Sequence, residues 1–203
     1  MVTYRLIHPI NMPKQARSAA LWHEGWYRCA KAEASPNFEP RPVGSTIDLV
    51  VVHSISLPPG DFHNGNVQKL FLNQLDWDAH PYFQSIRGLK VSAHFFISRN
   101  GELWQFVSCD HRAWHAGQSS YHGRTDCNNY SVGIELEGLE GGVFEAVQYE
   151  TLSTLAAAIF ANYPIRHVAG HEHISAGRKL DPGVGFDWSY LRDSLGLWSG
   201  CLP

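Results

Sequence analysis

The sequence predicts a mixed α/β (α+β) fold, in which a single domain has a central mixed β-sheet flanked by helices. Residues 46–53 form a short, β-branched apolar run, which is typical of a buried central strand. Two alternating apolar runs meet at Asn100-Gly101, which indicates an antiparallel hairpin. Segments with helical periodicity separate these strands, and this order favours a sheet with helices packed on its faces.

The first part of the chain contains little regular structure before the first strand. Residues 1–20 mix apolar and turn residues without a period, so we expect an N-terminal tail followed by one domain, residues 21–203. Residues 35–45 are rich in Pro and Ser and predict a surface loop. After the strand, apolar residues recur at i, i+3, i+4 and i+8 over residues 66–75, which predicts a one-sided helix.

The later elements have clear boundary signals. The hairpin spans residues 91–107, and its Asn-Gly pair predicts a type I′ turn. Residues 131–138 alternate between apolar and polar side chains, as a strand does. Residues 146–163 have helical periodicity and precede a proline, which ends the helix. A last helix is expected to begin after Asp187, a good N-cap, and to end near Gly196.

Composition excludes several classes of protein. The chain has 203 residues, of which 44% are hydrophobic and 17% charged, with a formal net charge of −3. This balance excludes a polybasic nucleic-acid binder and a compositionally disordered chain. The apolar runs are too short to span a bilayer, so we expect neither nucleic-acid nor membrane partners. Histidine is unusually frequent, with 12 residues, which suggests a site that uses imidazole.

The cysteines and the N-terminus bear on the cellular compartment. The four cysteines occur singly and form no Cys-x-x-Cys pair, which argues against a zinc ribbon and against a thioredoxin-like motif. The N-terminal segment contains no uninterrupted apolar stretch of the kind found in secretory signals. These features predict a cytoplasmic protein with four unpaired thiols.

Separate segments contain residues that could bind a metal ion. His53 ends an apolar strand, where ligand sites collect in open α/β sheets. His171 and His173 follow the long helix, and Asp181 lies in an Asp-Pro-Gly sequence. Each also has an ordinary interpretation, as a structural histidine, a histidine-rich loop or a turn residue. Together, two histidines and one carboxylate leave an open coordination position, which is the ligand number of a catalytic zinc site.

A hydrolytic zinc site also needs a base and a group that stabilises negative charge. Glu135, on the polar face of its strand, is a candidate base, and Lys179 is a candidate cation. Glu135 and Glu137 equally fit a solvated strand face. Two histidines and a carboxylate also form the facial triad of non-haem iron enzymes, although those enzymes usually take a close His-x-Asp or His-x-Glu pair from one strand. Analysis of the bound metal distinguishes these interpretations.

Several segments, in the same order, closely resemble the AmpD-type N-acetylmuramoyl-L-alanine amidases. These belong to the zinc amidase family that includes phage amidase lysozymes and peptidoglycan recognition proteins. The similar segments cover approximately residues 25–190 and include GWYRCAKAEASPNF, LVVVHSISLPPG, DAHPYF, VSAHFFISRNGELWQFVS, RAWHAG, SSYHGRTDCNNYSVGIELEG, GHEHIS and RKLDPG. So many ordered segments make the resemblance more specific than any single motif.

The resemblance implies roles for individual residues. It implies that His53, His171 and Asp181 hold zinc. The general base of the family falls on Glu135, and its lysine that stabilises the transition state falls on Lys179. Many relatives outside the AmpD-type branch use cysteine as the third ligand, and none of the four cysteines of this chain stands at that position.

Further residues are expected around the substrate. Tyr82 matches a tyrosine that lies beside the metal in this family. Ser54 stands where asparagine usually follows the first ligand, and Lys90 stands where arginine is common. His94 and His115 are expected to line the site or to support the metal ligands from behind. We therefore expect substrate contacts from Tyr82, Ser54, Lys90 and His94.

The resemblance implies zinc-dependent hydrolysis of the amide bond between (1,6-anhydro-)N-acetylmuramic acid and L-alanine in muropeptides, during cell-wall recycling. The expected partner is a small glycopeptide, the expected cofactor is Zn²⁺ without an organic group, and a monomer is compatible with the sequence. The alternative is a non-catalytic muropeptide-binding module on the same fold. Such modules typically lack a metal ligand, whereas all three ligand positions are filled in this chain.

Overall fold

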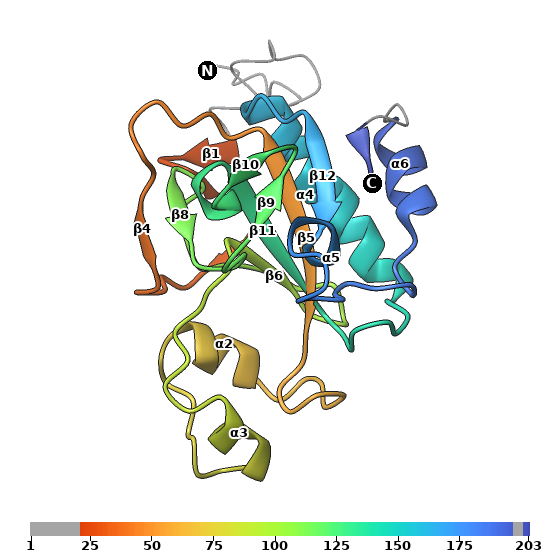
Figure 1. Ribbon diagram of the computed structural model, residues 1–203. Coiled ribbons are helices and arrows are strands. Elements are labelled where there is room, and N and C mark those ends of the chain that lie inside the picture. Colours follow the sequence, from red (N-terminus) through yellow and green to blue (C-terminus); the bar gives the residue numbers. More distant parts are fainter. Residues whose placement is uncertain (1–20, 197–200) are drawn as a thin grey trace, which may run out of the picture.

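A six-stranded mixed sheet forms the centre of the molecule (Figure 1). The computed structural model describes residues 21–196 and 201–203, and the expected tail, residues 1–20, lies outside the described residues. The strand order is β12-β5-β11-β6-β7-β3. In that order the strands comprise His167–Gly170, Leu49–Ile55, Ser131–Glu137, Phe95–Ile97, Leu103–Gln105 and Lys31–Ala32. The predicted mixed sheet is therefore confirmed.

Four adjacent strands, β12, β5, β11 and β6, run parallel. On β11, Ile134 and the apolar residues two positions away on each side pack into the main core, as the alternation predicts. The intervening residues of β11, which include Glu135 and Glu137, are also buried, so the interpretation of a solvated strand face is wrong. Both faces of these central strands are covered, which is typical of parallel sheets.

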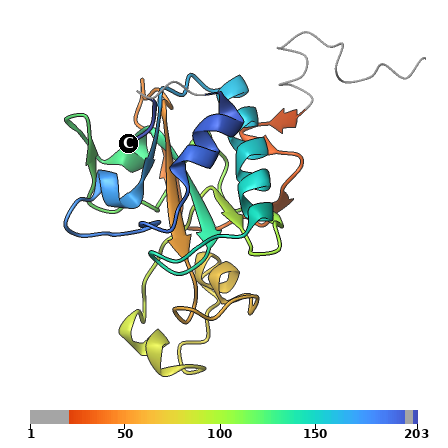
Figure 2. The same cartoon turned by 90° about the vertical axis from the view of Figure 1, so that its right-hand side faces the viewer.

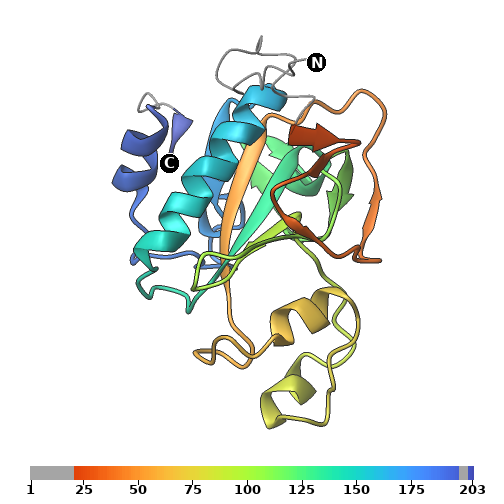
Figure 3. The same ribbon diagram turned by 180° about the vertical axis from the view of Figure 1, so that it is seen from behind.

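Helices lie on both faces of the sheet. Helices α4 (Ala146–Asn162) and α6 (Trp188–Leu195) cover one face, and the short helix α5 (His171–Ile174) lies on the other (Figures 2 and 3). The predicted ends of α6 are confirmed. The Asp187 side chain accepts a hydrogen bond from the N–H of Tyr190 at the start of α6, and Gly196 ends the helix in the left-handed conformation.

A separate segment lies beyond the carboxyl ends of β5 and β11 and contains helices α2 (Asn66–Phe71) and α3 (Pro81–Ser85) (Figure 1). Two buried polar residues outside the segment hold it in place. The Ser35 hydroxyl and the Asn37 amide both donate to the carbonyl of Phe71, and the Asn37 amide also donates to the carbonyl of Val91. These bonds tie the end of α2 and the last part of the segment to the body of the protein.

The ends of two predicted elements differ clearly from the prediction. The helix expected over 66–75 ends at Phe71, because Asn73 adopts a left-handed conformation with φ 57°. The strand that was expected to end at His53 continues to Ile55, because β11 pairs with it over its whole length. His53 therefore lies inside the strand rather than at its last position.

The predicted hairpin is confirmed, but its type I′ turn is wrong. A type I′ turn needs a positive φ at both central residues, and Gly101 has a positive φ whereas Asn100 does not. The N–H of Gly101 donates to the carbonyl of Ser98, and the N–H of Ser98 donates to the carbonyl of Glu102. This is the pattern of a three-residue loop that ends in a left-handed glycine.

Short two-stranded ladders surround the main sheet. Within the expected loop 35–45, strand β4 (Phe38–Pro40) pairs with β8 (His111–Ala113), because a distant segment supplies its hydrogen-bond partners. The other ladders join β1 (Trp22–His23) to β2 (Trp26–Tyr27) and β9 (Ser120–Tyr121) to β10 (Arg124–Thr125). A 3-10 helix, η2 (Cys127–Asn129), precedes β11. In the described part of the chain, no helix has the length and apolar character needed to cross a membrane.

Candidate metal centre and active site

Adjacent parallel strands bring three of the predicted site residues together. His53 on β5 lies directly opposite Glu135 on β11 in the strand register. His171 begins helix α5 immediately after β12 ends at Gly170, and β12 is the other neighbour of β5. Asp181 reaches the same point because its carbonyl accepts a hydrogen bond from the N–H of Glu172 on α5. The site therefore lies at the carboxyl ends of neighbouring strands, as in other α/β sheets.

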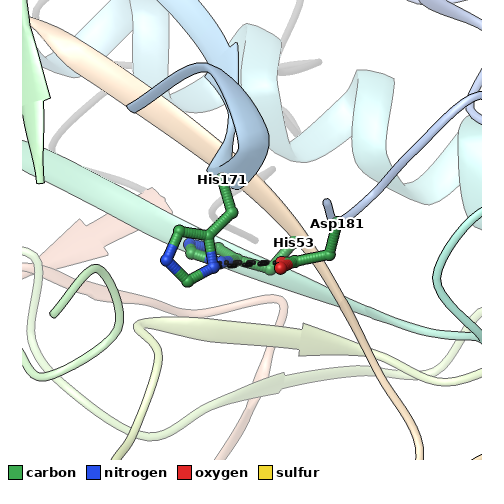
Figure 4. A group of neighbouring side chains, drawn as sticks. All are labelled: His53, His171 and Asp181. Carbon is green, nitrogen blue, oxygen red and sulfur yellow. Dashed lines mark hydrogen bonds and ion pairs between the residues drawn. The ribbon is translucent and has the colours of Figure 1, made fainter. Parts of the chain in front are cut away.

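His53, His171 and Asp181 converge in a compact, buried cluster (Figure 4). The Nδ1 atoms of the two histidines are 2.9 Å apart. The Asp181 Oδ2 atom lies 3.1 Å from Nδ1 of His171 and 3.4 Å from Nδ1 of His53. Within the described residues, this is the one group of three or more such side chains close enough to share a metal ion.

The protonation of His171 makes this cluster suited to a cation. Its Nε2 atom lies 3.1 Å from the backbone carbonyl of Ala116, which can only accept, so the neutral ring, the form that binds a metal, has its proton on Nε2. Nδ1 then presents a lone pair to the Asp181 carboxylate oxygen, which is also an acceptor. Two acceptors at this distance repel one another, and a bound cation converts the repulsion into attraction. The donor set of two imidazole nitrogens and one carboxylate oxygen fits Zn²⁺.

His53 is a neutral ligand candidate as well. Burial lowers its pKa to about 4, and the neighbouring His171 adds to the shift. The ring is therefore uncharged at neutral pH, as a metal ligand must be. His173, which the sequence offered as a further ligand, is exposed and has another role: its Nδ1 accepts a hydrogen bond from the N–H of Gly170.

Glu135 lies beside the cluster without being part of it. Its Oε1 atom is 4.0 Å from Nδ1 of His53, and its buried Oε2 atom has no hydrogen-bond partner. Burial raises the pKa of Glu135 well above its usual range, and the negative charge of Asp181 raises it further. The positive charge of Lys179 acts in the opposite direction. A buried carboxylate with a free oxygen and a raised pKa is suited to accept a proton.

A pocket of about 340 Å³ opens onto this cluster. Glu135, His171 and Asp181 form part of its lining. Lys179, Tyr82 and Ser54 also line the pocket, so the structure places these predicted residues at the site. Tyr82 comes from α3, on the segment beyond the strand ends.

Two of the residues that were expected to touch substrate have other positions. Lys90 is exposed and lies between Leu89 and Val91, which line the pocket, but it is not itself a lining residue. His94 is completely buried and does not line this pocket. Its Nδ1 accepts a hydrogen bond from the N–H of Gly133, and its Nε2 donates to the carbonyl of His111. Both ring nitrogens are occupied, so a direct substrate contact does not fit the position of His94.

Sequence reasoning missed the apolar wall of the pocket. This wall consists of apolar side chains from α2, from the loops before α2 and after α3, and from the loop after β11: Leu57, Leu70, Phe71, Ile86, Leu89, Val91 and Leu139. Most of these residues also pack into a small hydrophobic core. The helical periodicity of the sequence indicates this core packing and does not indicate a ligand-binding surface. Leu89 and Leu139 are 42% and 46% exposed, and this exposure of two large apolar side chains at the pocket is visible only in the structure.

Glu137, on the same face of β11, has a structural position. Its Oε1 accepts from the N–H of His63 at 2.7 Å, and its Oε2 accepts from the N–H of Arg99 at 2.9 Å. The carboxylate is buried and does not line the pocket. Glu137 therefore joins the loop after β5 to the hairpin loop.

We expect Glu137→Gln to destabilise the fold by about 1–3 kcal/mol, because the amide nitrogen would face a backbone N–H and leave it unsatisfied. Turnover of the folded variant should fall less than about tenfold, since no proton transfer depends on this group. Urea unfolding and steady-state rates measure the two effects. A loss of turnover beyond a hundredfold with unchanged stability would contradict this assignment.

The comparisons with known proteins agree with this geometry. The pattern that defines the N-acetylmuramoyl-L-alanine amidase family matches residues 43–184. The chain is 45% identical over 174 residues to the 1,6-anhydro-N-acetylmuramyl-L-alanine amidase AmpD of Citrobacter freundii. This aligned region covers 85% of this chain and 93% of that protein. It is 44% identical to the Escherichia coli K12 enzyme of the same name, and the aligned region covers 85% of this chain and 95% of that enzyme.

Solved structures give the same result. A crystal structure of a selenomethionine AmpD derivative superposes with a TM-score of 0.84 at 45% identity, covering 86% of this chain and 99% of that chain. The E. coli amidase AmiD, in complex with anhydro-N-acetylmuramic acid-L-Ala-D-γ-Glu-L-Lys, superposes with a TM-score of 0.54 at 27% identity, covering 77% of this chain and 61% of that chain. The resemblance inferred from sequence segments is thus confirmed, and the chain belongs to the N-acetylmuramoyl-L-alanine amidase family, in its AmpD-type branch.

Proposed function

We propose that this protein is a zinc-dependent amidase that hydrolyses the bond between 1,6-anhydro-N-acetylmuramic acid and L-alanine in muropeptides recovered during cell-wall recycling. The observation that carries the proposal is the buried cluster of His53, His171 and Asp181 at a pocket that also contains Glu135. The names of relatives that are 44–45% identical over most of their length support the choice of substrate.

In this proposal His53, His171 and Asp181 hold zinc, which as a Lewis acid polarises a carbonyl group and lowers the pKa of water. Glu135 takes a proton from the attacking water at its free carboxylate oxygen and passes it to the leaving nitrogen of L-alanine. Lys179 contributes a positive charge at the edge of the pocket, which stabilises the oxyanion of the tetrahedral intermediate.

Other pocket residues bind the glycopeptide. Tyr82 and Ser54 contribute hydroxyl groups to the pocket lining, and the exposed Lys90 lies in the chain between the lining residues Leu89 and Val91. The apolar wall excludes water and packs against uncharged parts of the substrate. The partner is therefore a small glycopeptide, as in the AmiD complex with its anhydro-muropeptide.

We further propose that residues 21–203 form the amidase domain, that residues 1–20 are a separable tail, and that the protein works in the cytoplasm. The match to the family pattern at residues 43–184 supports the domain assignment. The four cysteines carry free thiols in the described residues, which fits a reducing compartment.

Mass spectrometry of an anhydro-muropeptide incubated with the zinc-loaded protein tests the reaction. We expect release of a free peptide that begins with L-alanine, together with the anhydro-sugar. A matched substrate with D-alanine in place of L-alanine controls for unspecific amide hydrolysis. An intact substrate that binds without cleavage would overturn the proposal in favour of a non-catalytic muropeptide-binding module.

A further inference from the structure

A chain of buried hydrogen bonds leads from the backbone to His53. The hydroxyl group of Ser131, on β11, lies 2.6 Å from the carbonyl oxygen of Cys127 and 3.1 Å from Nε2 of His115. A carbonyl oxygen can only accept, so the single hydroxyl proton of Ser131 is committed to Cys127. The Ser131 oxygen must therefore accept a hydrogen bond from Nε2–H of His115.

This bond determines the protonation of both histidines. His115 is buried, and its ring nitrogens face Ser131 and His53 rather than a carboxylate, so the ring is neutral and Ser131 places its one proton on Nε2. Nδ1 of His115 then has a lone pair, and it lies 2.9 Å from Nε2 of His53. His53 must donate from Nε2, which leaves its Nδ1 lone pair facing Asp181 at 3.4 Å.

The fold makes room for this arrangement. A Cβ atom at Gly133 would lie 2.4 Å from Cγ of His115, so the glycine on β11 allows the ring to pack against the strand. The side-chain oxygen of Asn128 accepts hydrogen bonds from the N–H groups of His115 and Ala116, at 3.2 and 2.9 Å. Ring and backbone of His115 are thus both fixed.

We propose that Ser131 and His115 are positioning residues, which hold His53 in the tautomer that presents Nδ1 to the metal. For His171 the carbonyl of Ala116 has the same effect. Outer hydrogen bonds of this kind set ring orientation and ligand basicity in metal sites. The proposal rests on the zinc site proposed above, and it assigns a role in metal binding to Ser131, which is completely buried and does not line the pocket.

Ser131→Ala should change the proton positions rather than the fold. Without the hydroxyl, Nε2–H of His115 has no acceptor, and its proton moves to Nδ1. His115 then donates to His53, whose own proton must move to Nδ1, the atom that binds the metal. Removal of such an outer partner typically weakens metal affinity about 10–100-fold, and we expect a loss of this size.

The experiment uses the full chain in zinc-free and zinc-loaded forms. Nitrogen-15 NMR of the imidazole rings reports the tautomer of His115 in zinc-free protein, and competition with a chelating dye gives the zinc affinity. Ser108→Ala is the matched control, because Ser108 is also buried and its hydroxyl also donates to a backbone carbonyl, that of Glu24. Its zinc affinity should stay within about twofold of the wild type, since Ser108 contacts no metal-site residue.

The expected result is a proton on Nε2 of His115 in the wild type and on Nδ1 in Ser131→Ala, with weaker zinc binding in that variant alone. A wild-type His115 protonated on Nδ1 would overturn the inference without any variant, and so would unchanged zinc affinity in Ser131→Ala. The tautomer measurement needs no zinc. If the wild type had the expected tautomers but did not bind zinc, the proposed function would be refuted. The hydrogen-bond chain from Ser131 through His115 to His53 would still stand.

Discussion

Replacing Asp181 with alanine is expected to abolish zinc binding and to reduce turnover on the order of 10³-fold or more, because the site then loses its only anionic ligand. The Asp181 Oδ2 atom lies within 3.4 Å of both histidine Nδ1 atoms, so no other carboxylate oxygen can replace it. Glu135, another buried acid nearby, has its Oε1 atom 4.0 Å from Nδ1 of His53 and lies outside the three-residue cluster. Metal content by mass spectrometry and the rate of muropeptide hydrolysis measure the two effects.

Asp48→Ala is the matched control for this prediction. Asp48 is a buried aspartate whose carboxylate pairs with Arg124, away from the metal cluster. Its removal should leave the zinc content unchanged. In the wild type, a chelator should remove activity and added zinc should restore it. If iron restored activity and zinc did not, the facial triad of a non-haem iron enzyme would be the better interpretation of the same three ligands.

Glu135→Gln is expected to lower turnover by about 10²–10⁴-fold with zinc content unchanged, because removal of a proton-transfer group typically has that effect. The substitution keeps the shape of the side chain. It replaces the carboxylate, whose Oε2 atom has no protein partner, with an amide that cannot accept a proton at neutral pH. Zinc should remain bound because Glu135 lies outside the three-residue cluster.

The neighbouring glutamate provides the comparison for Glu135. Glu137 lies on the same strand face but accepts two backbone hydrogen bonds, so its glutamine variant should lose stability and keep most of its turnover. Glu135→Gln should therefore lose turnover, whereas Glu137→Gln should lose stability. If Glu135→Gln turned over substrate at near the wild-type rate, the assignment of the base would be wrong, whatever its effect on stability.

Local patterns in the sequence are sufficient to predict the central elements. The β-branched run around His53 and the alternation around Glu135 predict β5 and β11, because burial on both faces selects such residues. The caps at Asp187 and Gly196 predict both ends of α6, because they satisfy backbone groups locally. The grouping of His53, His171 and Asp181 follows from the resemblance to a known family, and the structure brings the three together.

Features that depend on distant partners could not be predicted in this way. Strand β4 exists because β8, some 70 positions later, supplies its hydrogen bonds. His94 looks like a site residue in the sequence, but Gly133 and His111 occupy its ring nitrogens. The hydrogen-bond chain from Ser131 through His115 to His53 depends on hydrogen-bond directions that only the packed structure defines. In each case the contact that determines the structure joins residues that are far apart in the sequence, so no local sequence pattern indicates it.

The attachment of the α2–α3 segment has a consequence for the evolution of this protein. The candidate ligands and the base come from the central sheet, from α5 and from the loop after α5, whereas Tyr82 and most of the apolar wall come from the segment held by Ser35 and Asn37. Chemistry and recognition are therefore encoded in different stretches of the chain. Mutations in the segment can alter the range of accepted glycopeptides while the hydrolytic machinery is inherited unchanged.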